Sequence, residues 1–369
     1  MVDVAIVGGG LAGLVNAILL ARHGFSVKLF EKKEYPFHRV CGEYISNEVT
    51  PFLKRNDLYP DHVEMAQINK FMLSSTNGNS AELSLGMGGF GISRFTLDHF
   101  LSEKAKEAGV DISTNTSVDD ITYQDDFFNI KVGKEQIESR IVIGAFGKRS
   151  NLDKKLQRKP ASTRSPYLAV KYHLKTDFPS DMIALHNFNN GYCGISKVEG
   201  DTYNLCYLSH RNNLKVHHSI PEMEKEILHK NPFLKEIFDN AEFLFDAPLV
   251  INEISFDNKL PVENHVLMSG DSAGMITPLC GNGMAMAIHS AKLLSDIINR
   301  NFKDGKVNKQ KVEAQYTRVW KQTFGFRLSA GRRIQALFGS ENASNLGVFL
   351  AGIKPIGNSL VRLTHGKEF

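Results

Sequence analysis

Long hydrophobic segments are missing from this sequence. No run of about 18 apolar residues occurs, so we expect no membrane-spanning helix. No basic region followed by an apolar stretch and a cleavage site stands near Met1, which predicts that there is no signal peptide. The formal net charge of +4 is small and argues against a nucleic-acid partner. We therefore expect a cytoplasmic protein with a small apolar substrate; peripheral contact with a membrane is left open, and the oligomeric state is undetermined.

Cysteine is also scarce, and internal repeats and low-complexity segments are absent. The four thiols belong to Cys41, Cys193, Cys206 and Cys280, and no two of them form a Cys-x-x-Cys pair. No group of cysteine and histidine residues has the spacing of a zinc site. We expect reduced thiols and no bound metal.

A length of 369 residues is too great for a single small core and indicates two closely packed domains. Val2–Val7 is a short apolar run that ends in glycines, and Leu11–His23 has the composition of a buried helix. Ser26–Phe30 fits a second strand. From about residue 167 to 208, apolar residues recur with a period of two, which is typical of an antiparallel sheet. The pattern predicts an α/β protein in which a Rossmann-like unit contains an inserted antiparallel sheet.

Further elements are expected outside these segments. Thr96 fits the N-cap of a helix that stops at Gly109, and 118–132 fits a hairpin that turns at Asp125-Asp126. Towards the C-terminus, aromatic and aliphatic residues, among them Ile334 and Leu337, are mixed with basic residues from Arg318 to Phe338. They fit either an amphipathic lid that meets a membrane or lipid-like substrate, or a core-facing helix pair with a solvated basic face. Helices are predicted over 221–238, 284–298, 312–338 and 346–353.

A glycine-rich turn follows the first predicted strand. Gly8, Gly10 and Gly13 match the pattern G-x-G-x-x-G, whose glycines permit a tight turn, close approach of the backbone to a pyrophosphate, and close helix packing. The following helix presents free N–H groups to the phosphates. Glu31 ends the second strand and would accept hydrogen bonds from ribose hydroxyls, which argues against a 2′-phosphate on this nucleotide. The predicted nucleotide contacts are Gly8, Gly10, Leu11, Ala12, Gly13, Glu31 and Lys32.

A second glycine-rich segment lies nearer the C-terminus. Residues 266–274 read VLMSGDSAG, a strand ending in Gly-Asp, and residues 277–284 read TPLCGNGM, a turn that opens a helix. With the N-terminal motif, this resembles the second FAD motif of the p-hydroxybenzoate hydroxylase and geranylgeranyl reductase superfamily. The resemblance implies that Asp271 binds the ribitol chain and that the turn at 281–283 faces the flavin pyrimidine, where a helix N-terminus favours negative charge. The implied contacts are Gly270, Asp271, Pro278, Gly281, Asn282, Gly283 and Met284.

Two arginine-containing segments extend the resemblance. Residues 36–43 read PFHRVCGE and are similar to the Arg-x-Cys-Gly-Glu segment of geranylgeranyl reductases and related hydroxylases. Residues 91–98 read GISRFTLD and resemble the family's Arg-x-x-Leu/Phe-Asp segment before a helix. Because arginine suits phosphate recognition, the resemblance implies FAD contacts at both arginines, although either could instead be a surface residue. The implied contacts are Arg39, Cys41, Gly42 and Arg94.

The sequence also departs from the family. The acid of the mid-chain Asp-Gly or Asp-Ala-x-Gly motif is missing from 143–150, which puts the usual FAD and NAD(P)H contacts of that loop in doubt and leaves Gly147 as the implied contact. Residues 191–197 keep the Gly-Tyr of the reductase motif Gly-Tyr-x-Trp-x-Phe-Pro, but Gly194 replaces the tryptophan and implies a roomier pocket. The halogenase motif Trp-x-Trp-x-Ile-Pro is absent. Since one nucleotide fingerprint occurs, NADPH or NADH is expected to bind transiently as the reductant.

Three residues are catalytic candidates. Cys41 is a proton donor or redox partner, because a thiol near positive charge titrates close to neutrality, or else a small buried residue in a tight turn. Glu43 is either an acid or base, or a hydrogen-bond partner of its loop. Tyr192 faces either the substrate or the core of the sheet.

The resemblance implies a Rossmann-like FAD-binding domain of the GR2 type, with an inserted antiparallel β-sheet substrate domain and a helical C-terminal end. The boundaries are 1–70, 91–160 and 262–310 for the FAD-binding domain, 71–90 and 161–261 for the substrate-binding sheet, and 311–369 for the helical region. We expect an FAD-dependent oxidoreductase, first an NAD(P)H-dependent monooxygenase of an apolar aromatic or polyketide-like molecule. The alternative is a geranylgeranyl-reductase-like flavin alkene reductase of a prenyl or polyene chain. A flavin halogenase and an inactive flavin-binding protein are more remote.

Overall fold

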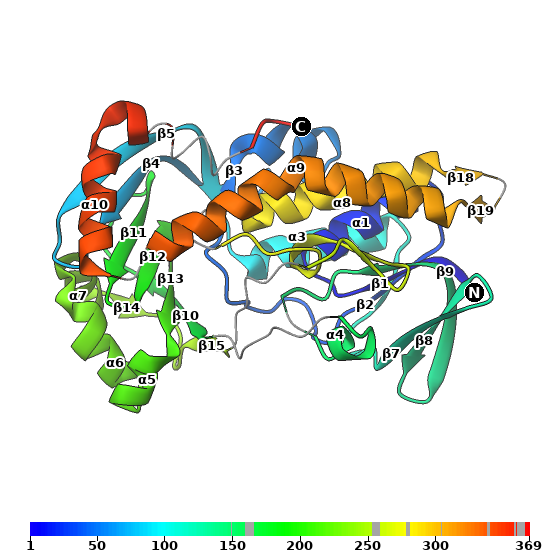
Figure 1. Ribbon diagram of the computed structural model, residues 1–369, viewed down its shortest axis with the longest axis horizontal. Coiled ribbons are helices and arrows are strands. Elements are labelled where there is room, and N and C mark those ends of the chain that lie inside the picture. Colours follow the sequence, from blue (N-terminus) through cyan, green and yellow to red (C-terminus); the bar gives the residue numbers. More distant parts are fainter. Residues whose placement is uncertain are drawn as a thin grey trace.

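The computed structural model describes residues 1–148, 150–158, 166–252, 259–277, 281–303, 305–337 (334–337 as backbone alone), 340–357, 359 and 366–369. Its two large sheets lie towards opposite ends of an elongated molecule (Figure 1). The long helix α9 (Lys309–Leu337) extends from one end towards the other.

The first sheet has the parallel core that the N-terminal pattern predicts. Its strand order is β16-β17-β9-β1-β2-β6, and the strands from β17 to β6 are parallel. Val4 on β1 pairs with Val27 and Ile141 on its two neighbours, and all three are buried, as expected of a sheet covered on both faces. The strands are β1 (Val2–Val7), β2 (Val27–Phe30), β6 (Asp111–Ser113), β9 (Glu135–Gly144), β16 (Val262–Glu263) and β17 (Val266–Met268).

Helices and a hairpin complete this half of the molecule. The predicted hairpin is present and turns at Asp125-Asp126 between β7 (Asp120–Gln124) and β8 (Phe127–Val132), which pairs with β9. The helix expected from Thr96 begins earlier, because Ser93 is its N-cap and the Ser93 hydroxyl accepts a hydrogen bond from the Thr96 N–H at 3.1 Å. The other elements are α1 (Leu11–Arg22), α2 (Thr50–Arg55), α3 (Arg94–Glu107), α4 (Leu152–Lys155), α8 (Gly283–Arg300), β18 (Phe302–Lys303), β19 (Lys306–Val307), η1 (Asn47–Val49) and η3 (Gly270–Ser272).

The second sheet is the inserted, mainly antiparallel sheet that the period of two predicts. Its order is β14-β10-β13-β12-β11-β4-β5-β3, with β15 also paired to β10, and β4 and β11 form its parallel pair. Strand β3 and the first part of β4, residues 66–70, belong to the segment that the predicted boundary placed with the first domain. The strands are β3 (Tyr44–Ser46), β4 (Ala66–Ser74), β5 (Ser80–Gly91), β10 (Tyr167–Lys175), β11 (Met182–Phe188), β12 (Gly191–Lys197), β13 (Tyr203–His210), β14 (Glu242–Phe243) and β15 (Leu249–Asn252).

Helices cover both faces of the second sheet. The continuous helix predicted over 221–238 is interrupted at Asn231-Pro232, because proline supplies no N–H and Asn231 caps the next helix. On the opposite face, Val348 and Ala351 of α10 (Glu341–Gly352) pack in one apolar cluster with sheet residues. The face that carries Leu168, Val170 and Leu205 is covered by α5 (Arg211–His217), α6 (Ile220–Ile227), η2 (Leu228–Lys230) and α7 (Pro232–Asn240).

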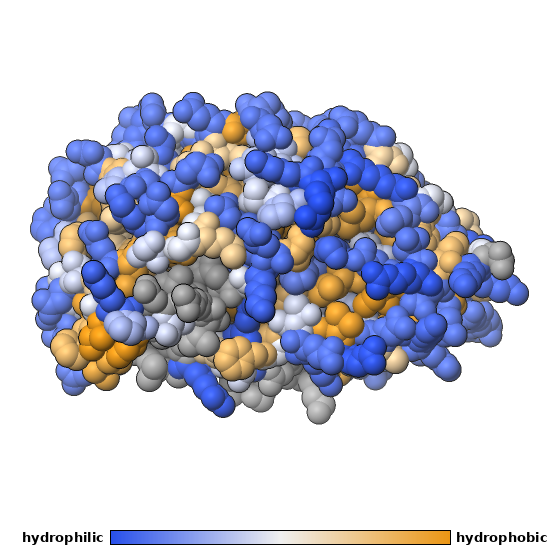
Figure 2. All heavy atoms as spheres, turned by 90° about the horizontal axis from the view of Figure 1, so that it is seen from above, coloured by the Kyte–Doolittle hydropathy of each residue, from blue (hydrophilic) through white to orange (hydrophobic). Residues whose placement is uncertain are grey.

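The aromatic C-terminal segment belongs partly to the core. Tyr316, Trp320 and Phe324 on α9 are buried in the core of the first domain, whereas Phe326 is 68% exposed. Ile334 and Leu337 have side chains outside the described set, and Phe338 lies outside the described residues. The face seen from above in Figure 2 is mostly hydrophilic, with hydrophobic residues gathered in places. Among the described residues, no helix is both long and apolar enough to cross a membrane.

Candidate functional site

The glycine turn between β1 and α1 has the geometry of a nucleotide cradle. Gly8 has a φ of +106°, and a Cβ there would overlap the carbonyl of Ala145. A Cβ on Gly13 would overlap the carbonyl oxygen of Gly8, so the helix and the turn approach as closely as the motif requires. Gly10 is the N-cap of α1 and supplies no side-chain cap. The first turn of α1 thus has the geometry in which backbone N–H groups bind phosphate.

Glu31 is buried at the end of β2 and lies against this turn. Its Oε2 accepts hydrogen bonds from the Gly9 N–H at 2.9 Å and from Arg39 Nη2 at 3.1 Å, while Oε1 accepts from the Lys33 N–H at 3.1 Å. A carboxylate so held at the end of the second strand fits the ribose of a bound nucleotide. Lys32, the residue between, is exposed.

Both predicted arginines meet at one buried carboxylate. Asp98 Oδ2 accepts from Arg39 Nε at 2.8 Å and from Arg94 Nη2 at 2.7 Å, and Oδ1 accepts from Arg94 Nε at 2.6 Å. A Cβ on Gly10 would lie 3.5 Å from Arg94 Nη2, so this guanidinium borders the cradle. Two positive side chains beside the helix N-terminus suit a pyrophosphate. Asp98 belongs to the motif at 91–98, but the sequence did not identify it as a site residue. The signal available in the sequence was its position four residues after Arg94, which allows an ion pair on one helix face.

The second glycine segment lies against the first. Gly270 has a φ of +66°, and a Cβ there would lie 2.9 Å from the Ala12 Cβ. Asp271 is half-buried in η3, and Ser272 Oγ accepts a hydrogen bond from the Gly147 N–H at 2.8 Å. The structure therefore brings 12, 147 and 270–272 together. Gly281, Asn282, Gly283 and Met284 form the entry to α8, whereas Pro278 and Cys280 lie outside the described residues.

The Cys41 loop crosses from one domain to the other. Glu43, with a φ of +55°, is fully buried; its Oε1 accepts from the Arg94 N–H at 2.8 Å and from Lys171 Nζ, and its Oε2 lies 2.7 Å from His173 Nε2. Burial favours the neutral acid, but Lys171 and His173 outweigh it and hold the pKa of Glu43 below its ordinary value. Asn204 Nδ2 donates to the Cys41 carbonyl at 3.2 Å. This carboxylate is saturated by donors and holds the loop on the sheet.

Lys171 and His173 were missed from the sequence, because they alternate with apolar residues on β10 and look like solvated positions. A second imidazole packs beside His173: the ring of His38 stacks on Phe95 with centroids 4.6 Å apart and lies edge-on to His173 at 5.0 Å. Burial lowers the pKa of His38 to about 4, and the nearby His173 and Lys171 add to the effect. His38 is therefore neutral at physiological pH.

The sheet face under this loop carries an apolar cluster beside polar residues such as Lys171 and His173. Tyr192 is 4% exposed and clusters with Leu185 and Leu208, and Val40 packs against the same cluster. Cys41, which follows Val40, instead packs against the core of the first domain. In the adjacent row, the register aligns Leu185, Gly194, Cys206 and Lys171. A Cβ on Gly194 would meet backbone oxygens at 3.7 and 3.9 Å, which is loose contact.

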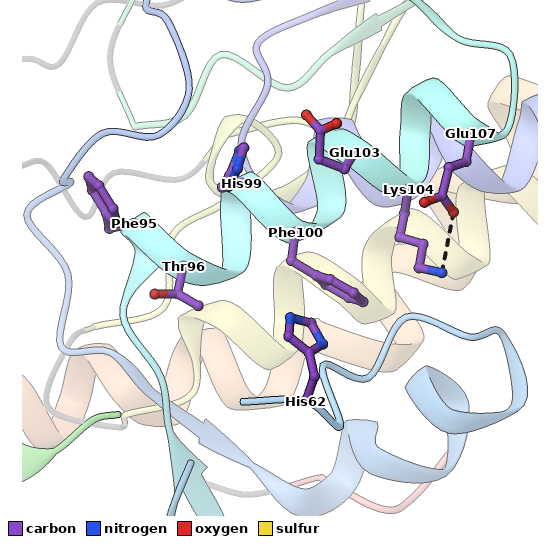
Figure 3. A pocket seen from close by; sticks show the side chains of 8 residues that line it. All are labelled: His62, Phe95, Thr96, His99, Phe100, Glu103, Lys104 and Glu107. Carbon is purple, nitrogen blue, oxygen red and sulfur yellow. Dashed lines mark ion pairs between the residues drawn. The ribbon is translucent and has the colours of Figure 1, made fainter. Parts of the chain in front are cut away.

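A surface groove of about 470 Å³ lies elsewhere, along the outer side of α3 (Figure 3). The ring of His62 faces Phe100, with centroids 5.4 Å apart, and Lys104 pairs with Glu107 at 3.3 Å at the far end. Two acids and one lysine at its rim do not suit a phosphate. We assign it no ligand. Its lining residues are His62, Phe95, Thr96, His99, Phe100, Glu103, Lys104 and Glu107.

The parallel sheet, the glycine cradle, the buried acid at the end of β2 and the paired arginines define a dinucleotide-binding protein. The residues fit FAD, since the turn excludes side chains where the pyrophosphate would lie and the second glycine segment continues the site. A family model described as an FAD binding domain matches residues 1–308. The chain belongs to this family and is an FAD-dependent oxidoreductase, for which NAD(P)H is the typical reductant.

Similar proteins fall into several functional groups. The chain is 26% identical over 360 residues to conditioned medium factor receptor 1 of Dictyostelium discoideum, covering 89% of this chain and 69% of that protein. It is 25% identical over 382 residues to digeranylgeranylglycerophospholipid reductase of Methanosarcina acetivorans, covering 98% of this chain and 90% of that protein.

Solved structures show the same fold. A geranylgeranyl bacteriochlorophyll reductase-like protein of Thermoplasma acidophilum has a TM-score of 0.76 at 18% identity, covering 100% of this chain and 96% of its own. The p-nitrophenol 4-monooxygenase of Pseudomonas putida also has a TM-score of 0.76, at 16% identity, covering 99% and 97%. The predicted fold class is thereby confirmed, and the fold is common to both reaction types that the sequence suggested.

Proposed function

We propose that this protein is a flavin-dependent alkene reductase that acts on a prenyl or polyene chain. The observation that supports this most is the Cys41 loop. Val40 packs against an apolar cluster of the second sheet, and the adjacent Cys41 packs towards the nucleotide-binding core. A thiol is thus poised between a surface that suits a hydrocarbon chain and the predicted flavin site. Similarity to a digeranylgeranylglycerophospholipid reductase over nearly the whole chain points the same way.

Reduction of a double bond adds a hydride to one carbon and a proton to the other. Bound FAD, once reduced by NADPH or NADH, supplies the hydride. Cys41 is the proposed proton donor. Glu43 accepts from three donors and is fully buried, so we assign it to holding the loop rather than to acid–base chemistry. Tyr192 and the space above Gly194 would line the chain-binding surface.

The FAD contacts follow from the site. The pyrophosphate would be held by the glycine turn and the two arginines, that is, by Gly8, Gly10, Leu11, Ala12, Gly13, Arg39 and Arg94. The ribose would be held by Glu31. Gly270, Asp271 and the turn at 281–283 would hold the ribitol and the pyrimidine. We infer secondary contacts from Lys32, Gly42, Gly147 and Met284; Pro278 remains a prediction outside the described residues.

The monooxygenase that the sequence first suggested is the main competing function. It uses the same FAD site and the same fold, so product analysis must distinguish the two. The flavin of the anaerobic protein is photoreduced, and the protein is mixed with a geranylgeranyl-glycerol ether lipid. The mass of the lipid is then measured by mass spectrometry. A gain of two hydrogens per double bond supports the proposal. A parallel aerobic sample receives NADPH, O₂ and an aromatic substrate. Incorporation of one oxygen atom from O₂ into that substrate, with no hydrogenation of any prenyl lipid in the anaerobic sample, would exclude the proposal.

Cysteine variants sharpen this test. Cys41→Ala should abolish hydrogenation while FAD stays bound and is still reduced. Cys193→Ala is the matched control, because Cys193 is buried on the opposite face of the sheet, among the residues that pack under α5–α7. If Cys41→Ala hydrogenates as fast as Cys193→Ala, the thiol is not the proton donor.

Contact with a membrane stays a prediction for a protein that we expect in the cytoplasm. The outer side of α10 exposes Leu346 (58%) and Phe349 (67%), three residues apart on one helix face. Flotation with vesicles of anionic phospholipid tests this; a Leu346→Ser, Phe349→Ser double variant should float less than the wild type.

A further inference from the structure

Glu48 is a second buried glutamate, five residues beyond Glu43 and not singled out by any sequence motif. It lies on η1 with its side chain fully buried. Its Oε1 accepts a hydrogen bond from Arg327 Nη1 at 3.2 Å, and its Oε2 accepts from Asn282 Nδ2 at 3.3 Å and from the Gly366 N–H. One carboxylate therefore joins three segments that are far apart in the chain.

The first of these segments is the turn that enters α8. Asn282 is the N-cap residue of α8, and its neighbour Gly281 has a φ of +62°. A Cβ on Gly281 would lie 3.6 Å from Tyr44 Cδ1, so β3 and η1 form one wall of this turn. The turn is the one that the family resemblance places at the flavin pyrimidine. Any shift of Glu48 is passed to it directly through Asn282.

The second segment is the C-terminal end of the chain, residues 366–369. The ring of Phe369 stacks on His289 of α8, with centroids 3.8 Å apart and planes at 12°, and also packs on Phe52 at 5.6 Å. Arg55 Nη2 donates to the Phe369 carbonyl at 2.8 Å. A Cβ on Gly366 would overlap Arg327 Nη2, so the backbone can approach this cluster only at glycine. These residues form a strap across α8.

We propose that Glu48 is a positioning residue for FAD, through which the strap 366–369 and Arg327 hold the turn 281–283 in its binding conformation. Charge-assisted hydrogen bonds to a buried carboxylate are strong and directional, which is what a turn without regular structure needs. Removing the carboxylate would leave the guanidinium of Arg327 without its partner and release Asn282. The proposal rests on FAD binding, which the family establishes, and not on alkene reduction.

The test is FAD affinity, measured by titrating apoprotein with FAD and following flavin fluorescence. Glu48→Gln should bind FAD about tenfold or more weakly, the loss expected for one charge-assisted hydrogen bond. Glu224→Gln is the matched control, since Glu224 is also a buried glutamate but lies against Tyr172 and Tyr207 in the second domain. Its affinity should equal that of the wild type.

The strap is tested separately with Phe369→Ala, which keeps the Glu48 side chain but removes the ring that stacks on His289 of α8. This variant should also bind FAD more weakly, and the double variant with Glu48→Gln should be no weaker than Glu48→Gln alone, because both act through one structure. Hydrogen exchange of the amides of 281–286 in the apoprotein should be faster in each variant than in the wild type.

Equal FAD affinities for Glu48→Gln and Glu224→Gln would overturn the proposal, as would independent, additive losses in the double variant. If Glu48→Gln does not fold, Phe369→Ala decides: wild-type affinity and wild-type exchange at 281–286 overturn it. If the variants bind FAD more weakly as expected but the wild type does not hydrogenate the prenyl lipid, the result counts against alkene reduction and not against this proposal.

Discussion

Nε2 of His173 lies 2.7 Å from Oε2 of Glu43, and both side chains are buried between the two domains. Glu43 follows the Cys41 loop, and His173 belongs to β10 of the inserted sheet. Lys171, two residues before His173, contacts the other carboxylate oxygen. The bond between these side chains is therefore a junction between the domains, and its loss would affect both.

Glu43→Gln should lower the free energy of unfolding by about 3 kcal/mol, because removing one partner of a buried ion pair leaves the other charge uncompensated. Urea unfolding measures this. Glu103→Gln is the control, since Glu103 is half-exposed and pairs with Lys106 on α3. That change should alter stability by less than about 0.5 kcal/mol. Equal losses in the two variants would show that the junction adds nothing to stability.

The same carboxylate predicts a pH dependence. Because the folded protein holds the pKa of Glu43 below its ordinary value of 4.5, its contribution is fully present above pH 4.5. It is lost as the pH falls through the lower, folded value. The urea midpoint of the wild type should thus fall more steeply on acidification than that of Glu43→Gln. Parallel acid limbs would assign the acid sensitivity to other groups.

Asp98 orients the two arginines beside the glycine cradle. Asp98→Asn keeps the size of the side chain but removes the charge that holds Arg39 and Arg94, so FAD should bind about tenfold more weakly. Asp57→Asn is the control, because Asp57 pairs with Lys104 and is 76% exposed. Isothermal titration of apoprotein with FAD compares them. Unchanged affinity in Asp98→Asn would mean that the arginines do not need this carboxylate.

The parts of the fold and site that could be predicted depend on local patterns. The glycine turn, the strand before it and the acid after it lie within about 30 residues, and backbone geometry dictates their spacing. The inserted sheet could be predicted for the same reason, because the alternation of apolar residues along each strand is also a local pattern. These patterns were enough for the fold class.

The partners of the buried acids could not be predicted in this way. Lys171 is 128 residues from Glu43, and Arg327 is 279 residues from Glu48, so only the packing of the two domains brings each pair together. In addition, a lysine that alternates with apolar residues in a strand, as Lys171 does, is normally interpreted as a solvent-facing residue. The start of α3 was misplaced because Ser93 and Thr96 are both good caps. Glu199, between β12 and β13, accepts a hydrogen bond from the Ser93 N–H at 2.8 Å.

Gly13 is expected to tolerate no side chain. In Gly13→Ala the new Cβ would overlap the Gly8 carbonyl, so the turn must move, at a cost of about 1–3 kcal/mol in stability and with loss of FAD. Gly325→Ala in α9 is the matched control, because a Cβ there meets nothing within 4 Å. It should stabilise the protein by about 0.5–1 kcal/mol, since alanine favours a helix. Thermal unfolding and flavin absorbance measure both; a Gly13→Ala protein that retains FAD would contradict the motif.

Glu224 should make the protein less stable as the pH rises. Burial raises the pKa of Glu224 to about 6, although hydrogen bonds from Tyr207 and Tyr172 act in the opposite direction. A raised folded pKa means that the stability is greatest below the ordinary value of 4.5 and is lost as the pH rises through 6. The loss amounts to about 2 kcal/mol.

Glu224→Gln keeps an oxygen that can accept from both tyrosine hydroxyls but cannot ionise. The variant should therefore be more stable than the wild type at pH 8 by about 2 kcal/mol and no more stable at pH 4. Urea unfolding at the two pH values gives both differences. An advantage of equal size at pH 4 and pH 8 would show that glutamine packs better, rather than that the carboxylate is costly when charged.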